Sequence, residues 1–78
     1  MGLGITGELV SVSASGPDGS VIIIGITTDD GRRVELRNEN GNSGDIDLLQ
    51  RHLGKRVQTI TAPNTDRLKS FESVYQIS

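Results

Sequence analysis

The sequence predicts a small, mostly β domain: a five-stranded barrel with one short helix between the third and fourth strands. Three observations favour this class. Apolar and polar residues alternate over much of the chain, which is the period of a half-buried strand. Clusters rich in Gly, Asp, Asn and Pro separate these segments and predict turns. The 78 residues suit a single domain, so we expect residues 1–78 to fold as one unit.

The first strand is expected over residues 3–15. Valine and alanine alternate with serine in its second half, whereas the apolar residues of its first half have the opposite parity. A bulge near Gly7-Glu8 would reconcile the two halves and bend the strand, as a barrel requires. The remaining strands are expected at residues 21–28, 32–38, 56–62 and 68–77, and the helix at residues 45–54.

The turn Asp29-Asp30-Gly31 decides how the second and third strands pair. A two-residue Asp30-Gly31 loop would pair Thr27 with Val34. A three-residue loop with Gly31 in the left-handed conformation would instead pair Ile26 with Val34. Register follows the hydrophobic pattern, and the second interpretation collects the apolar residues on one face, so we prefer it. The inward residues are then Ile22, Ile24, Ile26, Val34 and Leu36.

The helix has signals for both of its ends and one apolar stripe. Ser43 or Asp45 can cap its start, and Gly54 suits a left-handed stop. The stripe consists of Ile46, Leu49 and Leu53, which we expect to dock on the sheet.

The last two strands are less regular than the others. In the fourth, Val57 and Ile60 disagree in parity, so its inward face stays open. The fifth holds the two aromatic residues, Phe71 and Tyr75, of which Phe71 is expected in the core.

This layout resembles the OB-fold, and the resemblance covers nearly the whole chain. It is carried by the Gly7-interrupted first strand, the Asp29-Asp30-Gly31 hairpin, and the junction Leu53-Gly54-Lys55-Arg56-Val57 from helix to strand. An SH3-like barrel is the alternative, although it would normally place its helical turn before the last strand. The resemblance implies binding across strands two and three and by two loops, here residues 15–20 and 63–67.

Composition narrows the class of partner and the compartment. The net charge is −2, which argues against a dominant phosphate-binding surface. No apolar run approaches the length of a membrane helix, so no membrane partner is expected. The chain has no cysteine and shows no export signal at its start, which favours the cytoplasm.

Several fragments of catalytic or ligand-binding motifs have simpler interpretations. Residues 2–7 spell G-x-G-x-x-G, but that motif must open a helix and here a strand is expected. His52 has no partner at a recognisable spacing and suits a helix C-terminus. Asp29 and Asp30 fit a tight turn, and the asparagines of residues 38–45 supply too little charge for calcium. We therefore expect no catalytic residue, metal or cofactor, and no enzymatic activity.

The preferred register leaves one candidate surface on the outer face of the second and third strands. It predicts a non-catalytic module that binds a protein partner or a second copy. The alternative is weak binding of single-stranded DNA or RNA through the same face and the flanking loops, which requires the basic residues to converge. The candidate binding residues are Val21, Ile23, Thr27, Arg33, Glu35, Arg37, Lys55, Arg56 and Tyr75.

Overall fold

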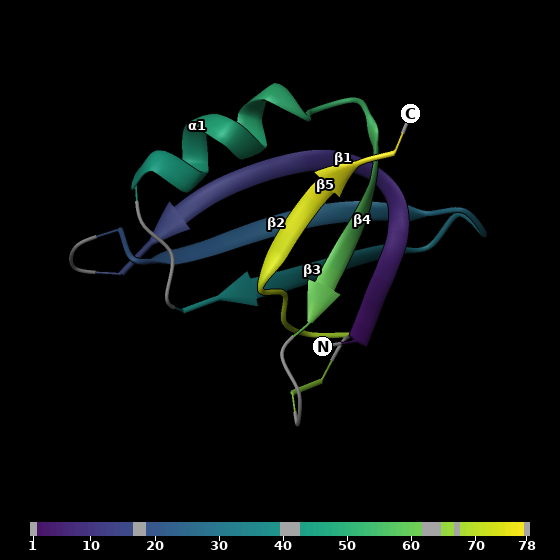
Figure 1. Ribbon diagram of the computed structural model, residues 1–78, viewed down its shortest axis with the longest axis horizontal. Helices are drawn as coiled ribbons and strands as arrows, with labels where there is room; N and C mark the ends of the chain where they lie inside the picture. Colours follow the sequence, from purple (N-terminus) through teal and green to yellow (C-terminus); the bar gives the residue numbers. More distant parts are fainter. Residues whose placement is uncertain (1, 17–18, 40–42, 62–64, 67, 78) are drawn as a thin grey trace.

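The computed structural model describes residues 2–16, 19–39, 43–61, 65–66 and 68–77. The chain forms five strands, with one helix between the third and the fourth (Figure 1). The elements are β1 (Gly2–Ser15), β2 (Val21–Thr28), β3 (Arg33–Asn38), α1 (Ser43–Arg51), β4 (Arg56–Thr61) and β5 (Ser73–Gln76). The mostly β class and the position of the helix are therefore confirmed.

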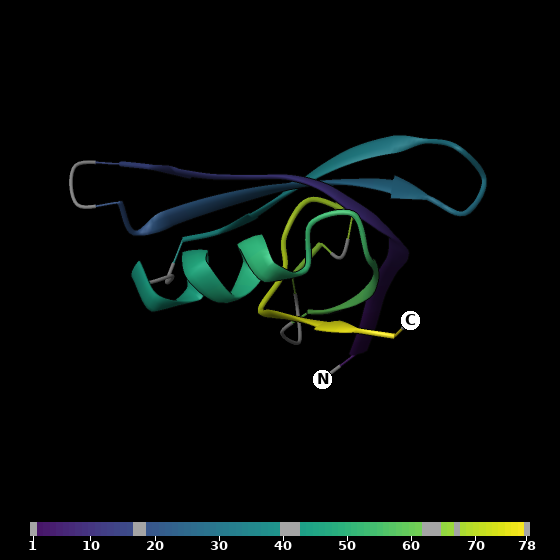
Figure 2. The same ribbon diagram turned by 90° about the horizontal axis from the view of Figure 1, so that it is seen from above.

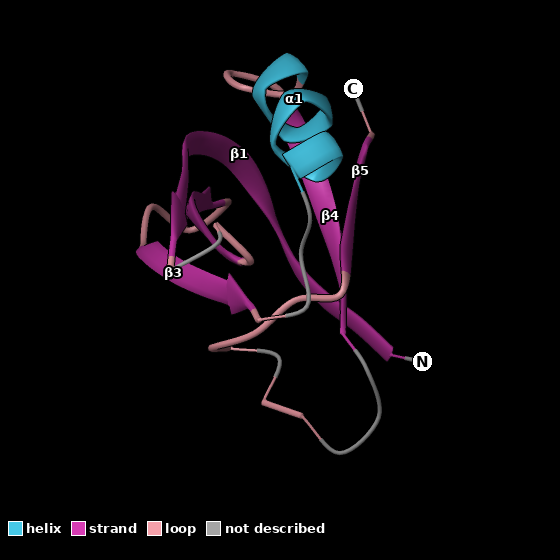
Figure 3. Cartoon of the chain, turned by 90° about the vertical axis from the view of Figure 1, so that its left-hand side faces the viewer, coloured by secondary structure: helices cyan, strands magenta, loops and turns pink. Residues whose placement is uncertain are grey.

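All five strands belong to one antiparallel sheet of order β3-β2-β1-β4-β5. β1 curves from the layer that it forms with β2 and β3 into a second layer beside β4 (Figure 3). Gly7 and Glu8 lie at this corner, since each pairs with β2 on one side and with β4 on the other. The expected bend is therefore present at Gly7-Glu8, but the irregularities in pairing lie on either side of these two residues. The register shifts lie between Leu9 and Ser11 against β2, and between Leu3 and Thr6 against β4.

The β2–β3 hairpin has the three-residue loop that the hydrophobic pattern favours. Ile26 pairs with Val34 and Ile24 with Leu36. The N–H of Thr28 donates to the carbonyl of Arg32 across a distance of 2.7 Å and closes the loop. Gly31 has a φ of 89°, the left-handed conformation that this loop requires.

Alanine at Gly31 is expected to destabilise the domain by roughly 1–2 kcal/mol, because a Cβ is unfavourable in the left-handed region. No atom lies within 4 Å of the added Cβ, so the cost is conformational and not steric. Urea unfolding followed by circular dichroism measures the change. Gly31→Asn is the matched control, since asparagine tolerates this conformation; an equal loss in both variants would contradict the explanation.

The core forms between the β1–β2–β3 layer and the elements packed against it. Its buried apolar members are Ile5, Leu9, Ile22, Ile24, Ile26, Leu36, Leu49, Val57 and Phe71. From α1, Leu49 is buried and Ile46 packs against the cluster. Leu53 was expected in the same stripe, but it is 40% exposed because the helix ends at Arg51, before that residue.

In β4, most of the inward-facing positions are occupied by polar residues. Val57 is buried, and Thr59 and Thr61 follow it on the inward side, while Ile60 pairs outward with Leu3. The Thr59 hydroxyl is satisfied, since it accepts from the N–H of Ile5 at 2.7 Å and lies 3.3 Å from the Ile5 carbonyl.

The sheet does not close into a complete barrel. Among the described residues, the chain before β5 approaches β3 at one parallel bridge, between Arg37 and Ser70. The expected fifth strand over residues 68–77 is therefore too long: its first part makes a turn and this bridge, and the strand itself begins at Ser73. Phe71 is buried as expected.

Candidate functional site

The β1–β2–β3 layer has one covered and one uncovered face. α1, β4 and β5 all lie on the same side of it (Figure 2), over the buried isoleucines of β2. In the described part of the chain, no helix or strand covers the other side. This uncovered face carries six of the candidate residues: Val21, Ile23, Thr27, Arg33, Glu35 and Arg37.

Cross-strand pairing brings these residues together. Ile23 pairs with Arg37, and Thr27 pairs with Arg33. The β2 side chains Val21, Ile23 and Thr27 are half-buried, whereas Arg33, Glu35 and Arg37 on the edge strand are exposed. The face is thus a short strip of two aliphatic residues and one threonine (Val21, Ile23 and Thr27, here the aliphatic strip), flanked by a row of alternating charges. Arg37 is in part engaged, because its guanidinium lies 3.9 Å from the Glu39 carboxylate.

β1 extends this face with residues that the sequence interpretation did not include. Ser11 and Ser13 pair with Gly25 and Ile23 of β2. A Cβ at Gly25 would clash only with the Ser11 hydroxyl, since it would lie at an ordinary contact distance of 3.6 Å from Val10, so the missing side chain leaves room for that hydroxyl over β2. The alternation of serine with apolar residues in β1 is the signal that could have identified them.

Lys55 and Arg56 lie outside this face, at the junction of α1 and β4. The Arg56 guanidinium binds the Asp29 carboxylate in a bidentate manner, with Nε–Oδ1 at 3.2 Å and Nη2–Oδ2 at 2.5 Å. Lys55 is exposed, and its carbonyl accepts from the N–H of Leu9 at 3.0 Å. The Arg56 guanidinium is therefore paired with Asp29, and this ion pair connects the β2–β3 loop to β4.

The Arg56–Asp29 hydrogen bonds lower the pKa of Asp29 and raise that of Arg56. A carboxyl with a lowered folded-state pKa stabilises the fold above its unfolded pKa, and this contribution disappears as the pH falls through the lowered value. We expect Asp29→Asn to be less stable than the wild type at neutral pH and equal to it well below about pH 4. Urea unfolding across this pH range measures the difference; a gap that persists in acid would contradict the ion-pair explanation.

Tyr75 lies on β5, on a different outer surface. It pairs with Gln58 of β4 and is 44% exposed. Leu3 and Ile60, which pair with each other, belong to the same surface. The structure therefore does not bring Tyr75 to the arginines of β3, and the candidate residues Arg33, Arg37, Lys55 and Arg56 do not form one cluster with it.

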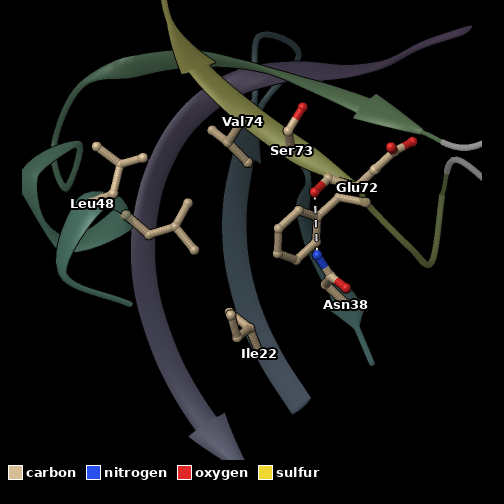
Figure 4. A pocket seen from close by; sticks show the side chains of 8 residues that line it. Ile22, Asn38, Leu48, Glu72, Ser73 and Val74 are labelled. Atoms are coloured by element: carbon tan, nitrogen blue, oxygen red, sulfur yellow. Dashed lines mark hydrogen bonds between the residues drawn. The ribbon is translucent and has the colours of Figure 1, made fainter. Parts of the chain in front are cut away.

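A pocket of about 90 Å³ opens where α1 meets the sheet (Figure 4). It is lined by Ile22, Asn38, Leu48, Leu49, Phe71, Glu72, Ser73 and Val74. The Asn38 side-chain amide donates to the Glu72 carbonyl at 3.2 Å, across its rim. Half of this lining, namely Ile22, Leu49, Phe71 and Val74, also belongs to the core or packs against it, so the pocket is a seam between helix and sheet.

The motif fragments lie where simple structural roles explain them. Residues 2–7 lie within β1 and open no helix. His52 follows α1, and its Nδ1 lies 3.2 Å from Gln76 Oε1. Asp30 accepts from the Thr28 hydroxyl within the hairpin loop. The caps expected at Ser43 and Asp45, and parts of the two implied binding loops, lie outside the described side chains.

Neither the described side chains nor comparison with known proteins points to a metal, a membrane or a related family. Among the described residues, no three His, Cys, Asp or Glu side chains gather as a metal site would require. The described helix is not long and apolar enough to cross a membrane. Comparison with protein-family models, curated proteins and solved structures gave no match to the chain.

Proposed function

We propose that the protein is a non-catalytic binding module that recognises a protein partner through the uncovered face of β2 and β3. The observation that carries the proposal is the position of this face opposite the core. β2 buries three isoleucines on one side and still presents Val21 and Ile23 on the other. An aliphatic strip with a charged rim is the composition of a protein interface more than of a phosphate-binding surface.

The proposal agrees with the resemblance to the OB-fold. The order of strands and helix, and a barrel that is only partly closed, support membership of that fold class. OB-folds bind across the same two strands, so the face proposed here is the one that the analogy implies. Fold analogy alone is a weak argument for function, and the proposal depends on the side chains of the face.

Substitution of Ile23 by Asp tests the proposal. The charge enters the middle of the aliphatic strip, and we expect it to abolish both retention of partners from an extract of the source cell and binding to the purified partner. Leu3→Asp is the matched control, because it makes the same change at a strand residue that is 65% exposed on another surface. If Ile23→Asp leaves partner binding and oligomeric state unchanged, this function is wrong.

Weak binding of single-stranded DNA or RNA is the second candidate, and Arg33 favours it. This arginine is exposed on the face and has no ion pair among the described residues. Phosphate contacts would make the affinity fall steeply with salt. Fluorescence anisotropy with labelled oligonucleotides tests this: a flat titration at low salt excludes it, and salt-sensitive binding lost in Arg33→Gln supports it.

A further inference from the structure

β3 is an edge strand, and its register with β2 decides which of its backbone groups face outward. The bond from the Thr28 N–H to the Arg32 carbonyl marks a hydrogen-bonded pair. Such pairs alternate along an antiparallel ladder, so the backbone groups of Val34 and Leu36 point to β2. Those of Arg33, Glu35 and Arg37 point away from it, to the edge.

Among the described residues, this edge is occupied at only one of its three outward-facing positions. The N–H of Arg37 donates to the Lys69 carbonyl at 2.9 Å, and its carbonyl accepts from the N–H of Phe71 at 3.1 Å. Lys69 and Ser70 belong to a turn, since the N–H groups of both donate to the Asp66 carbonyl. No described residue pairs with the outward backbone groups of Arg33 and Glu35.

The side chains of the same two residues also carry charges without an ion-pair partner among the described residues. Arg33 and Glu35 are exposed on the uncovered face, and neither forms an ion pair within the described ranges. Their charged neighbours each lie near an opposite charge, since Arg32 is 3.6 Å from Asp30 and Arg37 is 3.9 Å from Glu39. In the part of the chain that the structure describes, backbone groups without a partner and one charge of each sign without an ion pair therefore coincide on one short stretch.

We propose that this stretch pairs with a second copy of the chain, β3 against β3, about a two-fold axis at Val34. Antiparallel pairing about this axis places Arg33 opposite Glu35 of the second copy, and Glu35 opposite its Arg33. Both contacts join opposite charges, and each pair of residues exchanges two backbone hydrogen bonds. The interface is self-complementary, as a two-fold dimer requires. The inference rests on the proposed function, because it names one partner of the same module.

The pairing is short, so the dimer is weak. It cannot extend past Glu35 toward Arg37, because the chain around Lys69 already occupies that edge. A contact of this size belongs with transient associations and not with obligate dimers. Its affinity should rest on the two charge contacts together with the four backbone bonds, so reversal of one charge has a measurable effect.

Charge exchange tests the register. Sedimentation equilibrium from micromolar to millimolar concentration should show a monomer–dimer equilibrium for the wild type. Arg33→Glu and Glu35→Arg each turn both attractive contacts into repulsive ones, and each should weaken the dimer about tenfold or more. An equimolar mixture of the two variants restores both contacts in the heterodimer, as does the double variant in a homodimer. Glu72→Arg, an exposed charge reversal elsewhere, should change nothing.

A backbone variant tests the edge independently of charge. Glu35→Pro removes an N–H that points away from β2, so the β2–β3 ladder is kept while two bonds per dimer are lost. We expect a monomer with the wild-type circular dichroism spectrum. A wild-type chain that stays monomeric at millimolar concentration, or a mixture that does not restore the dimer, overturns the inference. If the dimer is overturned in this way but Ile23→Asp still abolishes partner binding, the proposed function stands without the dimer.

Discussion

Replacement of Gly7 by alanine is expected to destabilise the domain by about 3 kcal/mol, the upper part of the range for overpacked interiors. The added Cβ would meet the Thr27 carbonyl oxygen directly and would lie 2.9 Å from its carbonyl carbon and 2.8 Å from Ile26 Cγ2. The backbone of Thr27 cannot retreat, because it lies between β1 and β3 in the sheet. The loss is a large part of the roughly 4–12 kcal/mol typical of a chain of this length.

Gly25→Ala is the matched control for this prediction. It is the same substitution in a strand of the same sheet, but its Cβ would meet the Ser11 hydroxyl, which can rotate away. We expect its free energy of unfolding to lie within about 1 kcal/mol of the wild-type value. Urea unfolding followed by circular dichroism measures both variants. Equal losses would mean that the corner of β1 is not the constraint that we infer.

Truncation of Leu36 to alanine is expected to cost about 2–5 kcal/mol, the range for a fully buried aliphatic residue. Leu36 has no exposed surface and pairs with Ile24, which is also fully buried. The lost side chain would leave a cavity between β3 and the rest of the core. Thermal unfolding should show a fall of roughly 4–8 °C in Tm for each kcal/mol lost in a domain of this size.

Leu3→Ala removes the same atoms from the opposite environment. Leu3 is 65% exposed, so we expect a change within about 0.5 kcal/mol. The comparison separates burial from strand propensity, since both residues lie in strands. A similar loss in the two variants would show that the core is not where the structure has it.

The β2–β3 hairpin could be predicted from the sequence because two independent signals agree there. Gly31 marks the left-handed position of a three-residue loop, and the isoleucines of β2 then need Val34 and Leu36 opposite them. A register shifted by one residue would have placed Val34 and Leu36 on the opposite face from the buried isoleucines. The resulting outer face, including Arg33 and Glu35, followed from that register alone.

β4 and β5 could not be predicted as well, because their pattern is not hydrophobic. Thr59 is fully buried, and its hydroxyl is paired with the Ile5 backbone, 54 residues earlier in the chain. Periodicity treats such a threonine as a surface residue. The Arg56–Asp29 ion pair could not be predicted either. It joins a loop to a strand that is distant in the sequence, and no local sequence pattern indicates such a contact.

The pairing of β1 with both β2 and β4 also indicates the order in which the strands assemble during folding. Its partner β2 follows after a short turn, as does β3 after β2, whereas β4 must return across more than half of the chain. Closing the longer loop loses more entropy before any contact is gained. We therefore expect the three-stranded meander to form first and β4 to dock late, so that substitutions in the hairpin slow folding while those in β5 speed unfolding.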